Sequence, residues 1–255
     1  MNLVDYAVAD AVATITLNRP PVNALNAPLI ADIGEALEAA ADNAVRSVVI
    51  TGSPHFAAGA DISGFQAAFD DEGGPDLAGA LSSVVSQLQS LAKPTIAAVQ
   101  GFALGGGLEL AMGADLRYLS DEARVGQPEI LLGIIPGAGG TQRLPRIVGY
   151  QTALEMCMSG RQVEADEALR IGIADKVVSS ESLLETALAD AAAYASGPTI
   201  AYSAVKRAID IGYDMPLERG LDIEAAEFAR SFATHDARAG VAAFLSKQKP
   251  EFHGS

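Results

Sequence analysis

The pattern of apolar and polar positions divides the chain into a part that mixes strands with helices and a part that is helical throughout. The first part opens with two runs of alternating residues, 4–8 and 11–17, which predict a β-hairpin. Beyond the hairpin, apolar spacing predicts strands at 47–51 and 94–100 and helices at 26–41, 77–91 and 108–114, with a solvated turn at 70–75.

After residue 145 the pattern becomes helical, and from residue 196 it contains almost no strand. The predicted helices are 150–158, 164–171, 181–195, 200–211, 216–233 and 237–247. A Ser196-Gly197-Pro198 turn separates the third of these helices from the fourth. We therefore expect an α/β core at residues 1–195 and a helical C-terminal module at 196–255.

Composition and charge narrow the class of protein. The chain of 255 residues is 49% hydrophobic and 19% charged, which supplies a globular core, and charged residues interrupt every apolar stretch before membrane-spanning length. Its net charge of −15 disfavours nucleic acid and anionic membrane surfaces as partners. The first residues lack the pattern of a targeting segment, so we expect a cytoplasmic protein. The single Cys157 and three scattered histidines predict neither a disulfide nor a metal site.

The glycine run Gly105-Gly106-Gly107 lies between the strand at 94–100 and the helix at 108–114. Glycines at a helix start leave backbone N–H groups uncovered, and such a turn can hold an oxyanion or a phosphate. The alternative is that the glycines only allow the helix to pack close to the strand. The spacing does not match the dinucleotide-binding fingerprint.

Two glutamates stand in apolar surroundings. Glu109 lies in the first turn of the helix at 108–114, either on the surface near the helix dipole or buried beside the glycines, and burial is favoured. Glu129 follows Pro128 in a turn and, considered alone, also fits a solvated loop. Two desolvated carboxylates suit acid/base chemistry because burial and mutual repulsion move their pKa values. A third candidate is the small-residue loop at 56–62, which allows a ligand close to backbone amides or is an ordinary loop.

Three segments taken together resemble the enoyl-CoA hydratase (crotonase) family: FAAGADI at 56–62, GFALGGGLEL at 101–110 and GQPEILLGIIPGAGGTQRLPR at 126–146. The resemblance runs from RPPVNALN at 19–26 to FLSKQKPEF at 244–252. It implies an α/β spiral of ββα repeats with a C-terminal helical trimerisation module that forms a homotrimer or a dimer of trimers, a homohexamer.

The implied activity is that of a hydro-lyase, as in fatty acid β-oxidation. Water adds across the 2,3 double bond of a 2-enoyl-CoA thioester and gives a 3-hydroxyacyl-CoA. Coenzyme A is part of the substrate, and no separate cofactor is expected. The chain length of the acyl group does not follow from the sequence.

The resemblance also implies roles for particular residues. Ala60 and Gly106 would supply the two N–H groups of an oxyanion hole, and Glu109 and Glu129 would be the catalytic pair. The other implied positions contact the substrate: Ala24, Leu25, Ala58, Asp61 and Ile62 in the coenzyme A cleft, Gly137 near the water, and Phe228 and Lys247 closing the cleft, often from a neighbouring subunit.

Three alternatives stay open. An enoyl-CoA isomerase of the same family commonly keeps one of the two carboxylates, whereas both are present here. Some relatives bind RNA through a lysine-rich helix, but the matching helix carries Asp32, Glu35, Glu38 and Asp42 against Arg46. A catalytically silent scaffold is disfavoured by the intact glutamate pair.

Overall fold

The computed structural model describes residues 2–64 and 74–255. It opens with the predicted hairpin, formed by β1 (Val4–Ala9) and β2 (Val12–Leu17), which pair antiparallel with Val4 opposite Leu17. Asp10 and Ala11 make the turn with φ values of 49° and 62°, so the hairpin closes through two left-handed residues. Residues 70–73 of the predicted solvated turn lie outside the described residues.

A six-stranded sheet forms the centre of the core, and its strand order is β1-β2-β3-β4-β6-β9. From β2 to β9 all neighbours are parallel. The added strands are β3 (Ser47–Gly52), β4 (Thr95–Val99), β6 (Leu116–Ser120) and β9 (Lys176–Val178). Every residue of β3 and β4 is buried, as expected of parallel strands covered on both faces.

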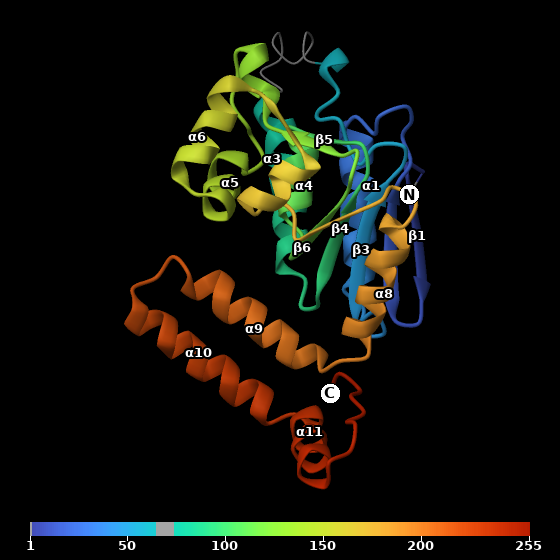
Figure 1. Cartoon of the computed structure of the whole chain (residues 1–255), viewed down its shortest axis with the longest axis vertical. Coiled ribbons are helices and arrows are strands. Elements are labelled where there is room, and N and C mark those ends of the chain that lie inside the picture. The colour runs from blue at the N-terminus through green and yellow to red at the C-terminus, as the bar shows by residue number, and fades with distance from the viewer. Residues whose placement is uncertain (1, 65–73) are drawn as a thin grey trace.

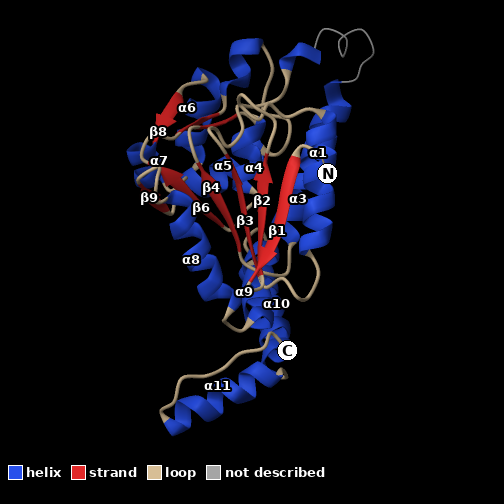
Figure 2. Ribbon diagram, turned by 90° about the vertical axis from the view of Figure 1, so that its right-hand side faces the viewer, coloured by secondary structure: helices blue, strands red, loops and turns tan. Residues whose placement is uncertain are grey.

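Helices cover both faces of this sheet (Figure 2). Because side chains alternate along a strand, Val48 and Ile50 point into one apolar cluster and Val49 into the other. The first cluster contains α1 (Ala27–Ala40) and α3 (Gly74–Ser90), and the second contains α8 (Leu183–Ala195). The side chain of Asn26 caps α1 by accepting the N–H of Leu29 at 3.0 Å.

A smaller sheet of three strands lies beside the first, in the order β5-β7-β8. Its strands are β5 (Phe102–Leu104), β7 (Arg124–Gly126) and β8 (Gln162–Glu164). The remaining helical elements of the core are η1 (Ile62–Gly64), α4 (Gly106–Met112), η2 (Pro128–Leu132), α5 (Gly140–Val148), α6 (Tyr150–Ser159) and α7 (Ala165–Ile171). Strand β5 leads through Gly105 into α4, so the small sheet fixes where that helix begins.

The last three helices leave the core, as Figure 1 shows. They are α9 (Thr199–Gly212), α10 (Leu217–Phe232) and α11 (His235–Ser246). Helices α9 and α10 pack together where Gly212 faces Gly220. Large apolar side chains stay exposed on them, and Phe228 and Phe244 expose 64% and 83% of their surface. The division into units 1–195 and 196–255 stays a prediction.

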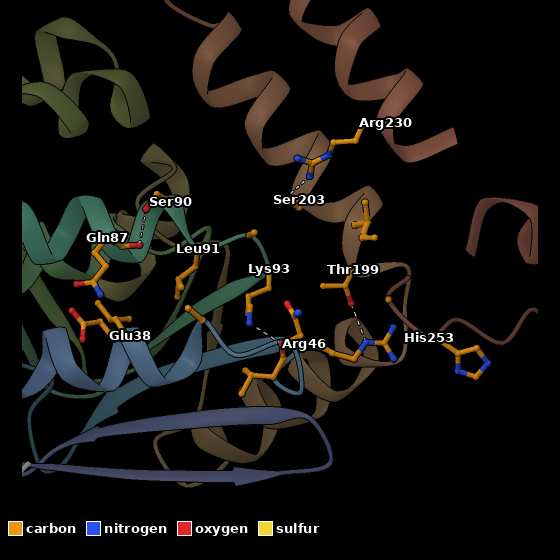
Figure 3. A pocket seen from close by; sticks show the side chains of 17 residues that line it. Glu38, Arg46, Gln87, Ser90, Leu91, Lys93, Thr199, Ser203, Arg230 and His253 are labelled. Atoms are coloured by element: carbon orange, nitrogen blue, oxygen red, sulfur yellow. Dashed lines mark hydrogen bonds between the residues drawn. The ribbon is translucent and has the colours of Figure 1, made fainter. Parts of the chain in front are cut away.

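A pocket of about 540 Å³ marks the junction between the core and these helices (Figure 3). Arg46 spans this junction, since its guanidinium donates to the carbonyl of Gly197, to Oγ1 of Thr199 at 3.0 Å and to the carbonyl of Phe252 at 3.1 Å. Lys93 donates to the carbonyls of Ala40, Asp42 and Val45. Both cations are thus engaged with the chain's own acceptors, Arg46 across the junction and Lys93 within the core. None of the helices in the described part of the chain is long and apolar enough to cross a membrane.

Candidate active site

A second cavity, of about 660 Å³, opens in the core where the loop 56–62, the start of α4 and η2 meet. Nine of the residues implied by the family resemblance line it: Ala24, Ala58, Ala60, Asp61, Ile62, Gly106, Glu109, Glu129 and Gly137. The rest of the lining includes the apolar side chains of Leu131, Leu132, Ile134 and Ile135. Segments far apart in the sequence therefore form one site, which is mainly apolar and contains the carboxyl groups of Asp61, Glu109 and Glu129.

Backbone hydrogen bonds with Leu25 fix the loop that carries Ala60. Leu25 donates to the carbonyl of Gly59 at 2.8 Å and accepts the N–H of Asp61 at 2.8 Å. Because these bonds lie on either side of Ala60, the N–H of Ala60 points away from Leu25. Asn23 supports the same loop, since its side chain donates to the carbonyl of His55 at 2.7 Å.

The glycine run at the start of α4 serves two purposes. A Cβ on Gly107 would lie 2.0 Å from the carbonyl oxygen of Ala57, so this glycine allows the helix to pack against the loop. Gly106 is the first residue of α4, where a helix leaves backbone N–H groups without intrahelical partners. Among the described residues, neither the N–H of Gly106 nor that of Ala60 donates to another protein group. The glycine run therefore allows close packing at Gly107 and leaves an unpaired backbone N–H at Gly106 among the described residues.

Glu109 is buried, with 2% of its surface exposed, as its apolar neighbours predict. Its Oε1 accepts the backbone N–H of Ala138 and that of Gly140, each at 2.7 Å. Burial raises the pKa of Glu109, while these two bonds and the charge of Arg143 oppose the rise. These two backbone N–H donors stabilise the ionised form of the Glu109 carboxyl group.

Glu129 stands in the first turn of η2, and Pro128 precedes it at the helix start. Its carboxyl group covers Gly105, where a Cβ would lie 2.8 Å from Oε1. Burial raises the pKa of Glu129 to about 7, and the nearby charge of Glu109 adds to the rise. Glu129 accepts neither of the two backbone N–H groups that Glu109 accepts, so the surroundings favour the ionised form more at Glu109 than at Glu129.

Three of the implied residues, Leu25, Phe228 and Lys247, do not line the cavity within this single chain. Leu25 is completely buried behind Gly106, so it supports the site through its backbone and does not contact the cleft. Phe228 lies on α10 and Lys247 follows α11. Figure 1 shows α10 and α11 apart from α4, whose first residues line the cavity. The helices that carry them point away from their own core.

The sequence did not point to the residues whose hydrogen bonds hold the site residues in position. Asn23, Ala138 and Gly140 hold the loop and Glu109 in place. The run Gly137-Ala138-Gly139-Gly140 contained a signal, because small residues before a helix leave backbone N–H groups accessible. Asn23 offered no such signal, since asparagine is common in proline-rich loops.

Two free N–H groups beside a pair of glutamates, on an α/β core with projecting helices, define the crotonase class of protein. Comparisons with known proteins agree. A family model described as enoyl-CoA hydratase/isomerase matches residues 7–255. A probable enoyl-CoA hydratase of Rhizobium meliloti is 46% identical, covering 94% of each chain. A short-chain-enoyl-CoA hydratase of Clostridium acetobutylicum is 42% identical, over 94% of this chain and 93% of its own.

A crystal structure of an enoyl-CoA hydratase from Geobacillus kaustophilus has a TM-score of 0.95 to this chain. It is 32% identical and covers 99% of this chain and 97% of its own. The expected crotonase-like fold is thereby confirmed. The chain belongs to the enoyl-CoA hydratase/isomerase family.

Proposed function

We propose that this protein is an enoyl-CoA hydratase, which adds water to a 2-enoyl-CoA thioester and forms the 3-hydroxyacyl-CoA. The observation that carries the proposal is the pair Glu109 and Glu129 lining one cavity with the free N–H groups of Ala60 and Gly106. The names of the relatives support it, and one of them is called a short-chain enzyme. We therefore expect a short acyl chain as the preferred substrate.

The two N–H groups act on the thioester carbonyl. As water attacks the β-carbon, negative charge grows on the thioester oxygen, where the N–H groups of Ala60 and Gly106 stabilise it. Their positions are fixed before the substrate arrives, by Leu25 behind Ala60 and by the start of α4 at Gly106. This stabilisation is greater in the transition state than in the ground state, so it raises the rate.

The two glutamates divide the proton transfers. Ionised Glu109 orients the water and accepts one of its protons while the C–O bond forms at the β-carbon. Protonated Glu129 delivers its proton to the α-carbon on the same face, so the double bond is consumed. Transfer of the proton from Glu109 to Glu129 then returns the pair to its starting state. The proposed chemistry needs only side chains, backbone N–H groups and water, without a separate cofactor or a metal.

The coenzyme A part of the substrate would lie along Ala24, Ala58, Asp61 and Ile62, at the mouth of the cavity. Asp61 there pairs with Arg19, which also donates to the carbonyl of Ala24 at 2.7 Å. Since Phe228 and Lys247 lie far from this cavity within one chain, we propose that a second copy brings them to it. The assembly would be a trimer or a dimer of trimers. A cytoplasmic location and the absence of nucleic-acid partners stay part of the proposal.

The isomerase alternative needs only one carboxylate to move a proton between the carbons of a 3-enoyl substrate. Both carboxylates face the same cavity here, which favours hydration. The test is a panel of 2-enoyl-CoA thioesters of graded chain length, beside a 3-enoyl-CoA. We expect loss of the conjugated absorbance, fastest for a short chain, with a 3-hydroxyacyl product. Double-bond migration without any hydrated product would overturn the proposal.

A further inference from the structure

Arg143 on α5 is half-buried and does not line the active-site cavity. It lines a separate pocket of about 880 Å³, which residues of the core and of α9 enclose. The side chain therefore has no direct access to a substrate in the active-site cavity. Its guanidinium nevertheless acts on the site, because its positive charge lowers the pKa of the buried Glu109.

The guanidinium of Arg143 connects α3 to the loop that precedes α5. Nε donates to Oε1 of Gln89 at 3.0 Å and Nη2 donates to Oγ of Ser86 at 3.3 Å, and both acceptors belong to α3. Nη1 donates to the backbone carbonyl of Ala138 at 3.2 Å. Because a guanidinium is planar and holds its donors in a fixed fork, the two bonds to α3 also fix the bond to Ala138.

The same loop supplies the hydrogen bonds of Glu109. The N–H of Ala138 donates to Oε1 of Glu109 at 2.7 Å, so Arg143 and Glu109 are bound to one residue from opposite ends of its backbone. Gly139 follows with a φ of 106°, and a Cβ there would lie 2.0 Å from Nη1 of Arg143. A glycine is therefore needed where the guanidinium lies against the loop. The N–H of Gly140 makes the second bond to Glu109.

We propose that Arg143 is a positioning residue that fixes the backbone of the 138–140 loop, so that the N–H groups of Ala138 and Gly140 aim the ionised Glu109 at the attacking water. The proposal rests on the proposed hydratase function. Arg143 acts through the loop and through its charge, without contact to the substrate. The alternative is a purely structural link between α3 and α5, which would affect stability but not the pH at which Glu109 becomes protonated.

The charged and titratable groups around Glu109 come from η2, α5 and α6. Glu129 on η2 and Cys157 on α6 both have pKa values that the charge of Glu109 raises. Arg143 on α5 has the opposite sign and favours the ionised form of Glu109, against the effect of burial. Removing the positive charge should therefore raise the pKa of Glu109 further.

The test replaces Arg143 with methionine, which has neither the charge nor the N–H groups, and compares crotonyl-CoA hydration across pH. We expect kcat to fall about 10-fold to 100-fold with little change in KM, because the water is no longer held in line. The acid limb of kcat/KM should move to higher pH, so that the loss is about 3-fold to 10-fold greater below that limb than at the optimum. The alkaline limb, which follows Glu129, should stay in place.

Arg143→Lys separates the charge from the hydrogen bonds. Its ammonium keeps the positive charge but cannot reproduce the planar fork. We expect the acid limb to return to the wild-type position while kcat stays about 10-fold below wild type. The matched control is Arg146→Met, which alters an exposed arginine three positions further along α5 that pairs with Asp214 at 3.0 Å. This control should leave kcat and both limbs unchanged.

Circular dichroism first establishes which variants fold. A folded Arg143→Met with the wild-type acid limb would show that Arg143 is a structural link only. If that variant does not fold, the lysine variant decides, because a wild-type kcat in Arg143→Lys would equally overturn the positioning role. In both cases the hydratase function would stand. A wild-type protein that hydrates no enoyl-CoA would instead refute the proposed function.

Discussion

At the scale of single residues, the two glutamates differ in what surrounds them and not in chemistry. Glu109 accepts two backbone N–H groups, whereas Glu129 accepts neither of them. The sequence predicted burial of Glu109 from its apolar neighbours, and the structure agrees. It could not predict which glutamate keeps the proton, because the donors Ala138 and Gly140 lie about thirty positions further along the chain.

The first prediction concerns pH. The kcat/KM for hydration should fall as pH rises past about 7, because Glu129 then loses the proton that it must deliver. It should fall again on the acid side as Glu109 becomes protonated, at a pH above that of an ordinary glutamate because the pKa of Glu109 is raised. Initial rates in constant-ionic-strength buffers measure this profile. A rate that stays constant from neutral pH to pH 9 would contradict the assignment of the proton to Glu129.

The second prediction concerns the oxyanion hole. Ala60→Pro removes the N–H, whereas Ala60→Gly keeps it, so the proline variant alone should lose about 10²-fold to 10³-fold in kcat. Gly106 is less suitable, because a Cβ there would lie 2.8 Å from Leu81. Circular dichroism must first show that both variants fold. Equal rates in two folded variants would exclude the N–H of Ala60 from catalysis.

At the scale of elements, long patterns were predicted well and short ones were missed. The hairpin, α1, β3 and β4 were predicted from periodicity. Strands β5, β7, β8 and β9 have three residues each, too few to show alternation, and their pairing depends on distant segments. Helix α5 was missed because Pro145 interrupts its pattern.

The third prediction belongs to the junction of the elements α9 and α11 with the core. Arg46→Met removes three hydrogen bonds, to Gly197, Thr199 and Phe252. We expect the free energy of unfolding to fall by about 1–3 kcal/mol and amide exchange around Gly197 to accelerate. Exposed Arg238 on α11 is the control, and Arg238→Met should change neither quantity. Wild-type stability and exchange in the Arg46 variant would show that the junction does not depend on this residue.

At the scale of the whole molecule, a single chain leaves large apolar side chains of its last helices uncovered. Its last helices project from the core (Figure 1). They expose large apolar side chains, among them those of Phe228, Phe232, Phe244 and Leu245. Exposed patches of this kind indicate an interface. The helical pattern of this region was predicted from the sequence, but the direction in which the helices project was not, because no local pattern records it.

The fourth prediction is therefore an assembly with a mass of three or six times 26.2 kDa, closed by rotational symmetry. Light scattering coupled to size-exclusion chromatography measures it at the concentration of the activity assay. Phe244→Asp should weaken the assembly, since it places a charge in the proposed apolar interface. A fully active monomer would contradict both the assembly and the role proposed for Lys247 of a second copy.

The central claim is that two glutamates share the hydration of an enoyl thioester. Its most direct test is the rate of crotonyl-CoA hydration by Glu109→Gln and Glu129→Gln, each beside Glu122→Gln, which alters an exposed glutamate. We predict that each active-site variant loses at least about 10²-fold in kcat with little change in KM, and that the Glu122 variant loses nothing. Near-normal hydration by either folded active-site variant would contradict the account.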